Sequence, residues 1–123
     1  RRLVAFVLDG DTPLPAQPPP YVPEPLVYPD FPVDEALAMR GARLYGAYCG
    51  ICHGGGVVAN AMAPDLRASG VSLDFTAFAE VVREGTRVDR SMPAFAALDD
   101  EELEAIRHYI RAVAHRDAGG AEE

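Results

Sequence analysis

The stretch Cys49-Gly50-Ile51-Cys52-His53 decides how the rest of this chain is interpreted. Two thiols stand three positions apart, an imidazole follows at once, and the 123 residues contain no other cysteine. A disulfide scaffold needs cysteines distributed along the chain, so this pair indicates a single local site. Apolar and small residues precede it at helical spacing, at positions 37, 41, 44, 45 and 48. The pair therefore closes a helix that we expect over residues 34–48.

This C-x-x-C-H pattern is the attachment signature of c-type haem. Thiols at the end of a helix can reach two vinyl groups on one side of a porphyrin, and the next residue then lies under the iron. We therefore expect one covalent haem c, bound through Cys49 and Cys52, with His53 as the proximal iron ligand. Covalent attachment takes place outside the cytoplasm, so the motif predicts a periplasmic protein.

Two other uses of such a cysteine pair fit less well. A thioredoxin-type dithiol opens a helix after a strand, whereas this pair closes a helix and no βαβ pattern surrounds it. A zinc site needs four ligands, and beyond the cluster only His108 and His115 remain, on a helix whose apolar face is needed for packing. We expect both histidines to be surface residues that favour the negative end of that helix.

The sixth iron ligand is expected from a distant loop that folds over the second haem face. Met92 is the leading candidate, because Pro93 breaks the backbone after it and helps to present the side chain. Met62 and Met39 are its competitors, and a histidine or an open site is the remaining alternative. A histidine and methionine pair raises the reduction potential and suits electron transfer, whereas an open site would bind small gases or reduce peroxide.

Residues near the ligands receive supporting roles. Pro64 can offer its carbonyl to the second nitrogen of His53 and so fix the tautomer, and Leu66 can pack against the haem edge. A simple turn is the alternative for Pro64. Three arginines could neutralise haem propionates, although a solvated side chain is the simpler interpretation of each: Arg67, Arg87 and Arg90.

The remaining pattern predicts an all-α domain. Asp99 and Glu102 form a capping box for a last helix that we expect to end near His115, and a shorter helix is expected between residues 74 and 85. Residues 50–72 and 85–98 are expected to be loops, and so much irregular chain in a small domain needs a ligand at its centre. Gly41 is costly inside a helix, so the first and last helices should approach closely there.

Nine of the eleven prolines fall in the first 33 residues. The apolar run Leu3 to Leu8 predicts a strand buried on both faces, and no partner strand follows, so we expect it to complete a sheet elsewhere. Residues 12–33 predict an extended proline-rich strap, with a disordered tail as the alternative. The expected division is therefore 1–33 for strand and linker, 34–117 for the helical domain and 118–123 for a flexible tail.

Charge and hydropathy exclude several classes of partner. The formal net charge is −8 and all eleven basic residues are arginine, so the chain lacks the basic face that nucleic acid requires and a lysine-rich docking ring. The longest apolar run, Leu3 to Leu8, is too short to span a membrane. We expect a protein partner to dock through hydrophobic contacts around the haem edge.

Several motifs recur together from residue 34 to about residue 115: Gly41-x-x-x-Tyr45-x-x-x-Cys49-x-x-Cys52-His53-Gly54, Pro64-x-Leu66, Met92-Pro93 and a terminal Leu-x-x-Ile-x-x-Tyr-Ile helix. In these residues the chain resembles class I cytochromes c. The resemblance implies three main helices around one covalent haem, with the first and last helices crossing where Gly41 meets Tyr109. It also implies His53 and Met92 as axial ligands.

The first third of the chain, together with two short motifs of the helical domain, resembles a narrower group. The strand Arg2-Leu3-Val4-Ala5-Phe6, the strap, and Cys-His-Gly-Gly-Gly followed by Pro-Asp-Leu-Arg are similar to the C-terminal end of quinohaemoprotein alcohol dehydrogenases, in which a PQQ-binding propeller precedes the cytochrome. The resemblance implies an electron-transfer domain without catalysis of its own. Its donor would be a PQQ-dependent dehydrogenase domain, and its acceptor a small periplasmic redox protein or oxidase. A free-standing periplasmic cytochrome c is the alternative.

The expected loops lead to a prediction about the haem-free chain. We expect Cys49→Ala or His53→Ala to leave a largely unfolded protein, because the haem supplies the centre of the core. Near-UV circular dichroism of the haem-free protein checks this against the holoprotein. A native-like near-UV spectrum without haem would contradict it.

Overall fold

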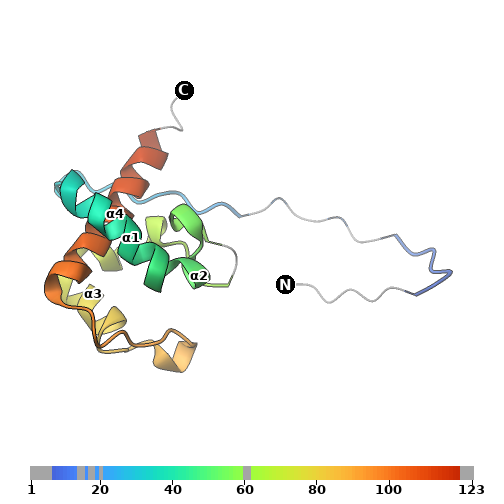
Figure 1. The fold of residues 1–123 in the computed structure, drawn as a ribbon. Coiled ribbons are helices and arrows are strands. Elements are labelled where there is room, and N and C mark those ends of the chain that lie inside the picture. Colours follow the sequence, from blue (N-terminus) through green and yellow to red (C-terminus); the bar gives the residue numbers. More distant parts are fainter. Residues whose placement is uncertain (1–6, 14–15, 17–18, 20, 60–61, 120–123) are drawn as a thin grey trace.

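The computed structural model describes residues 7–13, 16, 19, 21–59 and 62–119, and within them it is helical. The helices are α1 (Glu35–Tyr48), α2 (Gly50–His53), α3 (Phe75–Val82) and α4 (Asp100–Gly119). Short 3₁₀ turns lie between them at Gly55–Val57 (η1), Leu66–Ala68 (η2), Val71–Leu73 (η3) and Val88–Arg90 (η4). The described residues contain no strand, so the expected all-α class is confirmed (Figure 1).

Short polar side chains fix where the helices begin, as the sequence indicates. Asp34 accepts a hydrogen bond from an N–H in the first turn of α1, and Asp74 does the same for α3. At the start of α4, Asp99 and Glu102 each accept a hydrogen bond from the other's N–H, which is the expected capping box. These caps give the three longer helices fixed starting points.

The last helix ends later than expected. We expected α4 to stop near His115, but it continues to Gly119. Asp117 in this last turn forms an ion pair with the buried Arg67, at 2.9 Å, and so holds the turn against the rest of the domain. The sequence pattern did not reveal this partner, because the two residues lie 50 positions apart.

The helices α1 and α4 approach each other closely at Gly41. A Cβ atom built there would lie 1.9 Å from the Ala105 carbonyl oxygen and 2.9 Å from the Tyr109 Cβ. Only glycine leaves room for backbones this close, so the expected crossing at Gly41 is confirmed. Tyr45, one turn later, packs its ring 5.2 Å from that of Tyr109.

The core is formed where α3 and η1 meet these two helices. Its largest fully buried apolar side chains come mainly from α4, with one each from α1 and η1: Tyr45, Val57, Leu103, Ile106, Ile110 and Val113. Within the described residues, no helix combines the length and the hydropathy needed to cross a bilayer.

The two expected loops contain more structure than the sequence indicates. Residues 50–72 include α2, the 3₁₀ turns η1 and η2 and most of η3, and residues 85–98 include η4. Gly85, after α3, has a φ of +74°, and a Cβ there would lie 2.7 Å from the Ala94 Cβ. The chain therefore turns sharply after α3 and packs tightly on itself.

Part of the proline-rich strap lies against η2 and α4. The Leu26 N–H donates to the Arg67 carbonyl oxygen at 2.9 Å, and the Phe31 ring lies 5.0 Å from that of His108. Earlier in the strap, Tyr21 is 88% exposed. The expected strand over Leu3 to Leu8 lies outside the described residues, except for positions 7 and 8, which are exposed and belong to no strand. The strap therefore contacts the helical body of its own chain (Figure 1).

The crossing of α1 and α4 leads to a prediction with a built-in control. Gly41→Ala should lower the free energy of unfolding by at least about 2 kcal/mol, because the new methyl group forces two backbones apart. Gly46→Ala, in the same helix with nothing within 4 Å of its Cβ position, should raise it by up to about 1 kcal/mol. Guanidinium unfolding of both holoproteins measures the difference, and equal stabilities would refute the close approach.

Candidate haem-binding site

The cysteine pair and His53 lie where α1 passes into α2. Cys49 ends the first helix and begins the second, and its N–H donates to the Tyr45 carbonyl oxygen at 2.9 Å. The His53 N–H donates to the Cys49 carbonyl oxygen, also at 2.9 Å. Cys49 and His53 are buried, Cys52 is partly buried, and both cysteines are free thiols. One short turn therefore presents two thiols and an imidazole beside the core.

A single hydrogen bond determines the tautomer of His53. Its Nδ1 lies 2.9 Å from the Pro64 carbonyl oxygen, as the sequence predicts. A carbonyl oxygen can only accept, so we assign the proton to Nδ1, which donates. The other ring nitrogen, Nε2, then has a free lone pair, which is the form of imidazole that binds a metal. Pro64 thus does more than form a turn.

The segment after Pro64 is fixed by a buried ion pair. Asp65 accepts two hydrogen bonds from the Arg67 guanidinium, at 3.0 and 2.6 Å, and a third from the Arg67 N–H. Burial alone would raise the pKa of Asp65, but these hydrogen bonds outweigh it and hold the pKa below its usual value. Arg67 also binds Asp117 of α4. The solvated interpretation of Arg67 is therefore wrong, whereas Arg87 and Arg90 are exposed.

Arg111 of α4 joins this segment to the strap, and sequence reasoning missed it. The side chain is completely buried, and within the described residues it has no carboxylate partner. Its guanidinium donates to three carbonyl oxygens, those of Leu26 at 3.2 Å, Leu66 at 2.8 Å and Arg67 at 3.2 Å. Burial lowers its pKa. An arginine inside an apolar helix stripe was the available signal, because such a position needs buried acceptors.

The three methionines differ sharply in exposure. Met92 is partly buried and packs against the core, whereas Met39 is 70% exposed and Met62 is 69% exposed. The Met92 N–H donates to the Arg87 carbonyl oxygen at 3.2 Å, just after Ser91 adopts a left-handed φ of +67°. Of the three candidates, only Met92 is held by its loop with the side chain toward the core.

These residues fit a covalent haem c and fit dithiol chemistry poorly. Two free thiols, an imidazole with a free Nε2 and a partly buried thioether form the donor set that such a haem uses. Burial, reinforced by the neighbouring Cys52, raises the pKa of the Cys49 thiol to about 11. A reactive dithiol needs a lowered thiol pKa, so Cys49 lacks the property that redox exchange requires.

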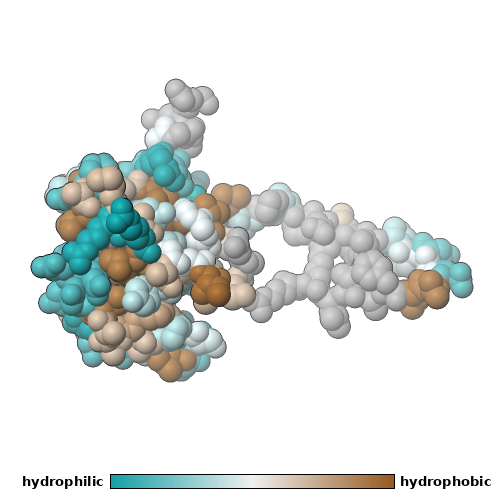
Figure 2. All heavy atoms as spheres, in the orientation of Figure 1, coloured by the Kyte–Doolittle hydropathy of each residue, from teal (hydrophilic) through white to brown (hydrophobic). Residues whose placement is uncertain are grey.

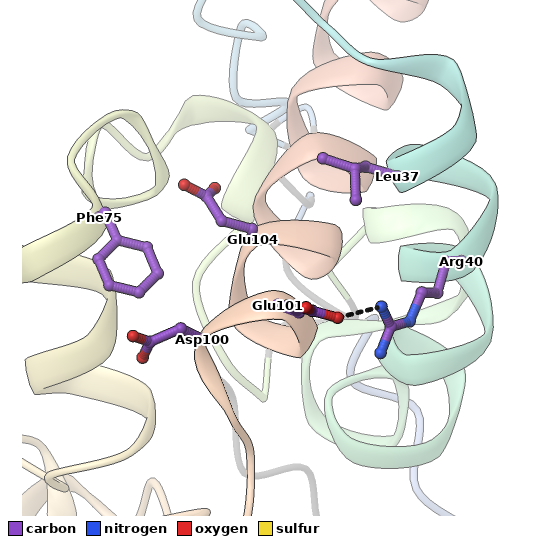
Figure 3. A pocket seen from close by; sticks show the side chains of 6 residues that line it. All are labelled: Leu37, Arg40, Phe75, Asp100, Glu101 and Glu104. Atoms are coloured by element: carbon purple, nitrogen blue, oxygen red, sulfur yellow. Dashed lines mark hydrogen bonds and ion pairs between the residues drawn. The ribbon is translucent and has the colours of Figure 1, made fainter.

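A separate hollow lies between the beginnings of α1, α3 and α4 (Figure 3). Its volume is about 380 Å³, and Arg40 forms an ion pair with Glu101 across its edge, at 3.2 Å. Of the α1 residues that line it, Arg40 is the one nearest to the cysteine pair, and the rise of a helix puts Arg40 and Cys49 about 14 Å apart. The hollow therefore lies away from the cysteine pair. In the described part of the chain, no group of three or more His, Cys, Asp or Glu side chains is arranged to hold a metal ion by itself.

The two histidines of α4 are less exposed than expected. His108 is partly buried, and its Nδ1 accepts a hydrogen bond from the Asp34 N–H at 2.9 Å. His115 is also partly buried, and its Nε2 has no partner within the described residues. The expectation of two surface histidines is therefore wrong. His108 instead links the start of α1 to α4, because a neutral imidazole nitrogen can accept a backbone N–H.

The Asp65 ion pair leads to a prediction about acid stability. Because the folded pKa of Asp65 lies below its unfolded value, the stability it contributes is fully present above about pH 4 and is lost as the pH falls through the folded pKa. Asp65→Asn should therefore cost about 2 kcal/mol at pH 7, and the difference should shrink below about pH 4. Urea unfolding from pH 7 to pH 3 measures it, with the exposed Glu80→Gln as control. A cost that stays constant over this range would contradict the assignment.

Comparison with known proteins places this geometry in a family. The family model described as cytochrome c oxidase, cbb3-type, subunit III matches residues 36–110. Quinohemoprotein alcohol dehydrogenase ADH IIB of Pseudomonas putida is 36% identical over 94% of this chain and 17% of its own length. The dehydrogenase subunit of a quinone-dependent alcohol dehydrogenase from Gluconobacter oxydans is 33% identical, over 89% of this chain and 14% of its own.

A solved structure supports the same assignment. Quinohemoprotein alcohol dehydrogenase ADHIIG from Pseudomonas putida HK5 superposes with a TM-score of 0.59 and 33% identity, over 81% of this chain and 14% of the other. This chain thus spans less than a fifth of the length of these relatives. Its helices match a class I cytochrome c fold, as the resemblance implied. The chain belongs to the cytochrome c family whose model is described as cytochrome c oxidase, cbb3-type, subunit III, and it is a domain that binds one covalent haem c for electron transfer.

Proposed function

We propose that this domain transfers single electrons through a haem c attached to Cys49 and Cys52, with His53 and Met92 as axial ligands. The hydrogen bond from His53 Nδ1 to the Pro64 carbonyl supports this most directly, because it leaves Nε2 free to bind iron. When bound, the haem supplies a one-electron change between ferrous and ferric iron. Leu66 is partly buried against the core and is proposed as a haem contact.

The surrounding residues of the chain hold the proposed ligands in place. Pro64 fixes the His53 ring, and the ion pair of Asp65 with Arg67 fixes the segment that contains Pro64. Tyr45 donates its hydroxyl to the Gly54 carbonyl oxygen at 3.0 Å and so fixes the backbone just after His53. A site whose ligands are already oriented needs little rearrangement when its charge changes, which favours electron transfer.

We further propose a PQQ-dependent alcohol dehydrogenase domain as the electron donor. Two relatives are named quinohemoprotein alcohol dehydrogenases, and this chain spans 14 to 17% of their lengths. In this proposal residues 1–33 are the strand and linker that precede the cytochrome domain, and that domain ends with α4 at Gly119 rather than at residue 117. The chain by itself oxidises no alcohol. Because covalent haem attachment occurs outside the cytoplasm, the proposed location is the periplasm.

The proposed acceptor is a small periplasmic redox protein or an oxidase that docks through apolar contacts. Large apolar side chains are exposed near the cysteine pair in sequence, with Ile51 86% exposed and Val58 46% exposed. Figure 2 shows hydrophobic residues at the surface of the helical body, interspersed with hydrophilic ones. The net charge of −8 and the absence of lysine leave no basic ring for docking.

A free-standing electron carrier is the second candidate, because the strap contacts α4 of its own chain: the Leu26 carbonyl accepts from Arg111, and the Phe31 ring lies against that of His108. The donor distinguishes the two. Rapid reduction of the ferric protein by an isolated PQQ-dependent alcohol dehydrogenase domain with its alcohol would support the first. Reduction by other periplasmic cytochromes alone would support the carrier.

The ligand proposal is tested by absorption spectra of the reduced and oxidised holoprotein. We expect a sharp low-spin c-type spectrum and a pyridine haemochrome whose haem resists acid-acetone extraction. Met92→Ala should keep the haem and the fold but lower the reduction potential and allow carbon monoxide to bind the ferrous protein, because the thioether is removed. The exposed Met39→Ala is the matched control. An unchanged potential in Met92→Ala would exclude Met92 as the ligand.

A further inference from the structure

The loop that contains Met92 has few hydrogen bonds to the rest of the domain. Between α3 and α4 its regular structure is limited to η4 (Val88–Arg90). The Met92 N–H bonds to Arg87 inside the same loop, at 3.2 Å. Two main-chain bonds attach the loop to α3: the Thr86 N–H donates to the Glu80 carbonyl oxygen at 3.1 Å, and the Phe95 N–H donates to the Val82 carbonyl oxygen at 2.8 Å. Side-chain packing must therefore hold the loop in place.

An aromatic contact joins this loop to α1. The rings of Tyr48 and Phe95 lie 5.5 Å apart and meet edge to face, at an interplanar angle of 73°. Tyr48 is the last residue of α1 and directly precedes Cys49, while Phe95 stands three residues after Met92. The contact therefore connects the attachment end of the site with the loop of the proposed methionine ligand.

The contact is made by the tyrosine ring and not by its hydroxyl. Tyr48 is 39% exposed, and its hydroxyl forms no hydrogen bond within the described residues. The partner ring of Phe95 is partly buried and packs against the core. A phenylalanine at position 48 would keep this packing, whereas an aliphatic side chain would lose the edge-to-face geometry.

We infer that Tyr48 is a positioning residue for Met92, acting through Phe95 to keep the methionine loop closed over the site. The inference deepens the proposed function and rests on Met92 as the sixth ligand. Imidazole can bind the ferric protein only if Met92 moves away with its loop. The Tyr48 and Phe95 rings must separate for that movement, so their contact opposes binding.

The expected effect is modest and measurable. Loss of one aromatic pair should raise the apparent affinity of the ferric holoprotein for imidazole about two- to tenfold. Tyr48→Leu and Phe95→Leu should each show this increase, and the double variant should exceed neither single variant by much, because both remove the same contact. The conservative variant Tyr48→Phe should keep the wild-type affinity for imidazole, because the ring contact with Phe95 remains.

Imidazole titration of the folded ferric holoprotein, followed by its absorption spectrum, is the test. Tyr28→Leu is the matched control, since this strap tyrosine is similarly exposed, at 44%. A general loss of stability would not change the imidazole affinity of the folded protein, whereas an opened loop would. Wild-type affinity in Tyr48→Leu, together with raised affinity in Met92→Ala, would overturn the positioning role alone. Unchanged affinity in Met92→Ala would overturn both the ligand assignment and this inference.

Discussion

The close approach of α1 and α4 at Gly41 is the constraint on which the rest of the structure depends. Because no Cβ intervenes, the backbone of α1 lies directly against Ala105, and Tyr45 reaches the ring of Tyr109 one turn later. This contact fixes the direction in which α1 ends. The cysteine pair and His53 follow within the next five residues, so their position is set by the helix crossing rather than by the loop after them.

Two buried arginines of α4 connect that helix to the irregular segments around it. Arg107 donates to the carbonyl oxygens of Ser72 and Leu73 and lies over the Phe31 and Phe75 rings, at 5.4 and 5.6 Å. Arg111 binds carbonyls of both the strap and the segment after Pro64. A guanidinium has five donors in a rigid fork, so one side chain can satisfy several irregular segments at once.

The two sides of the proposed haem site are held by different forces. On the His53 side, Pro64, Asp65, Arg67 and Arg111 form hydrogen bonds and ion pairs that are largely buried. On the Met92 side, the loop depends mainly on apolar contacts and on two main-chain bonds to α3, from the N–H groups of Thr86 and Phe95. Buried charged networks break only at high cost, whereas a surface aromatic contact opens easily. The histidine is therefore the fixed ligand of our proposal, and the methionine is the one that can be displaced.

The sequence by itself determined the helical class, the starts of the helices at Asp34, Asp74 and Asp99, and the close approach at Gly41. Each of these depends on local chemistry, namely a cap, a periodic stripe or a missing Cβ, which a reader of sequence can recognise. The hydrogen bond between His53 and Pro64 was also predictable, because the two residues lie only 11 positions apart and the motif suggests it.

Only the tertiary structure decided the roles of Arg67, Arg111 and His108 and the later end of α4. Apart from Asp65, which lies two positions from Arg67, their partners lie 44 to 85 positions away in sequence, and no local pattern identifies an acceptor at that distance. The sequence offers Leu26 and Phe31 as residues that can lie against a surface, but it does not identify α4 as that surface, since an extended proline-rich segment has no internal hydrogen bonds that specify a path. Local propensity determines which segments become helices, and long-range burial determines which polar groups they must satisfy.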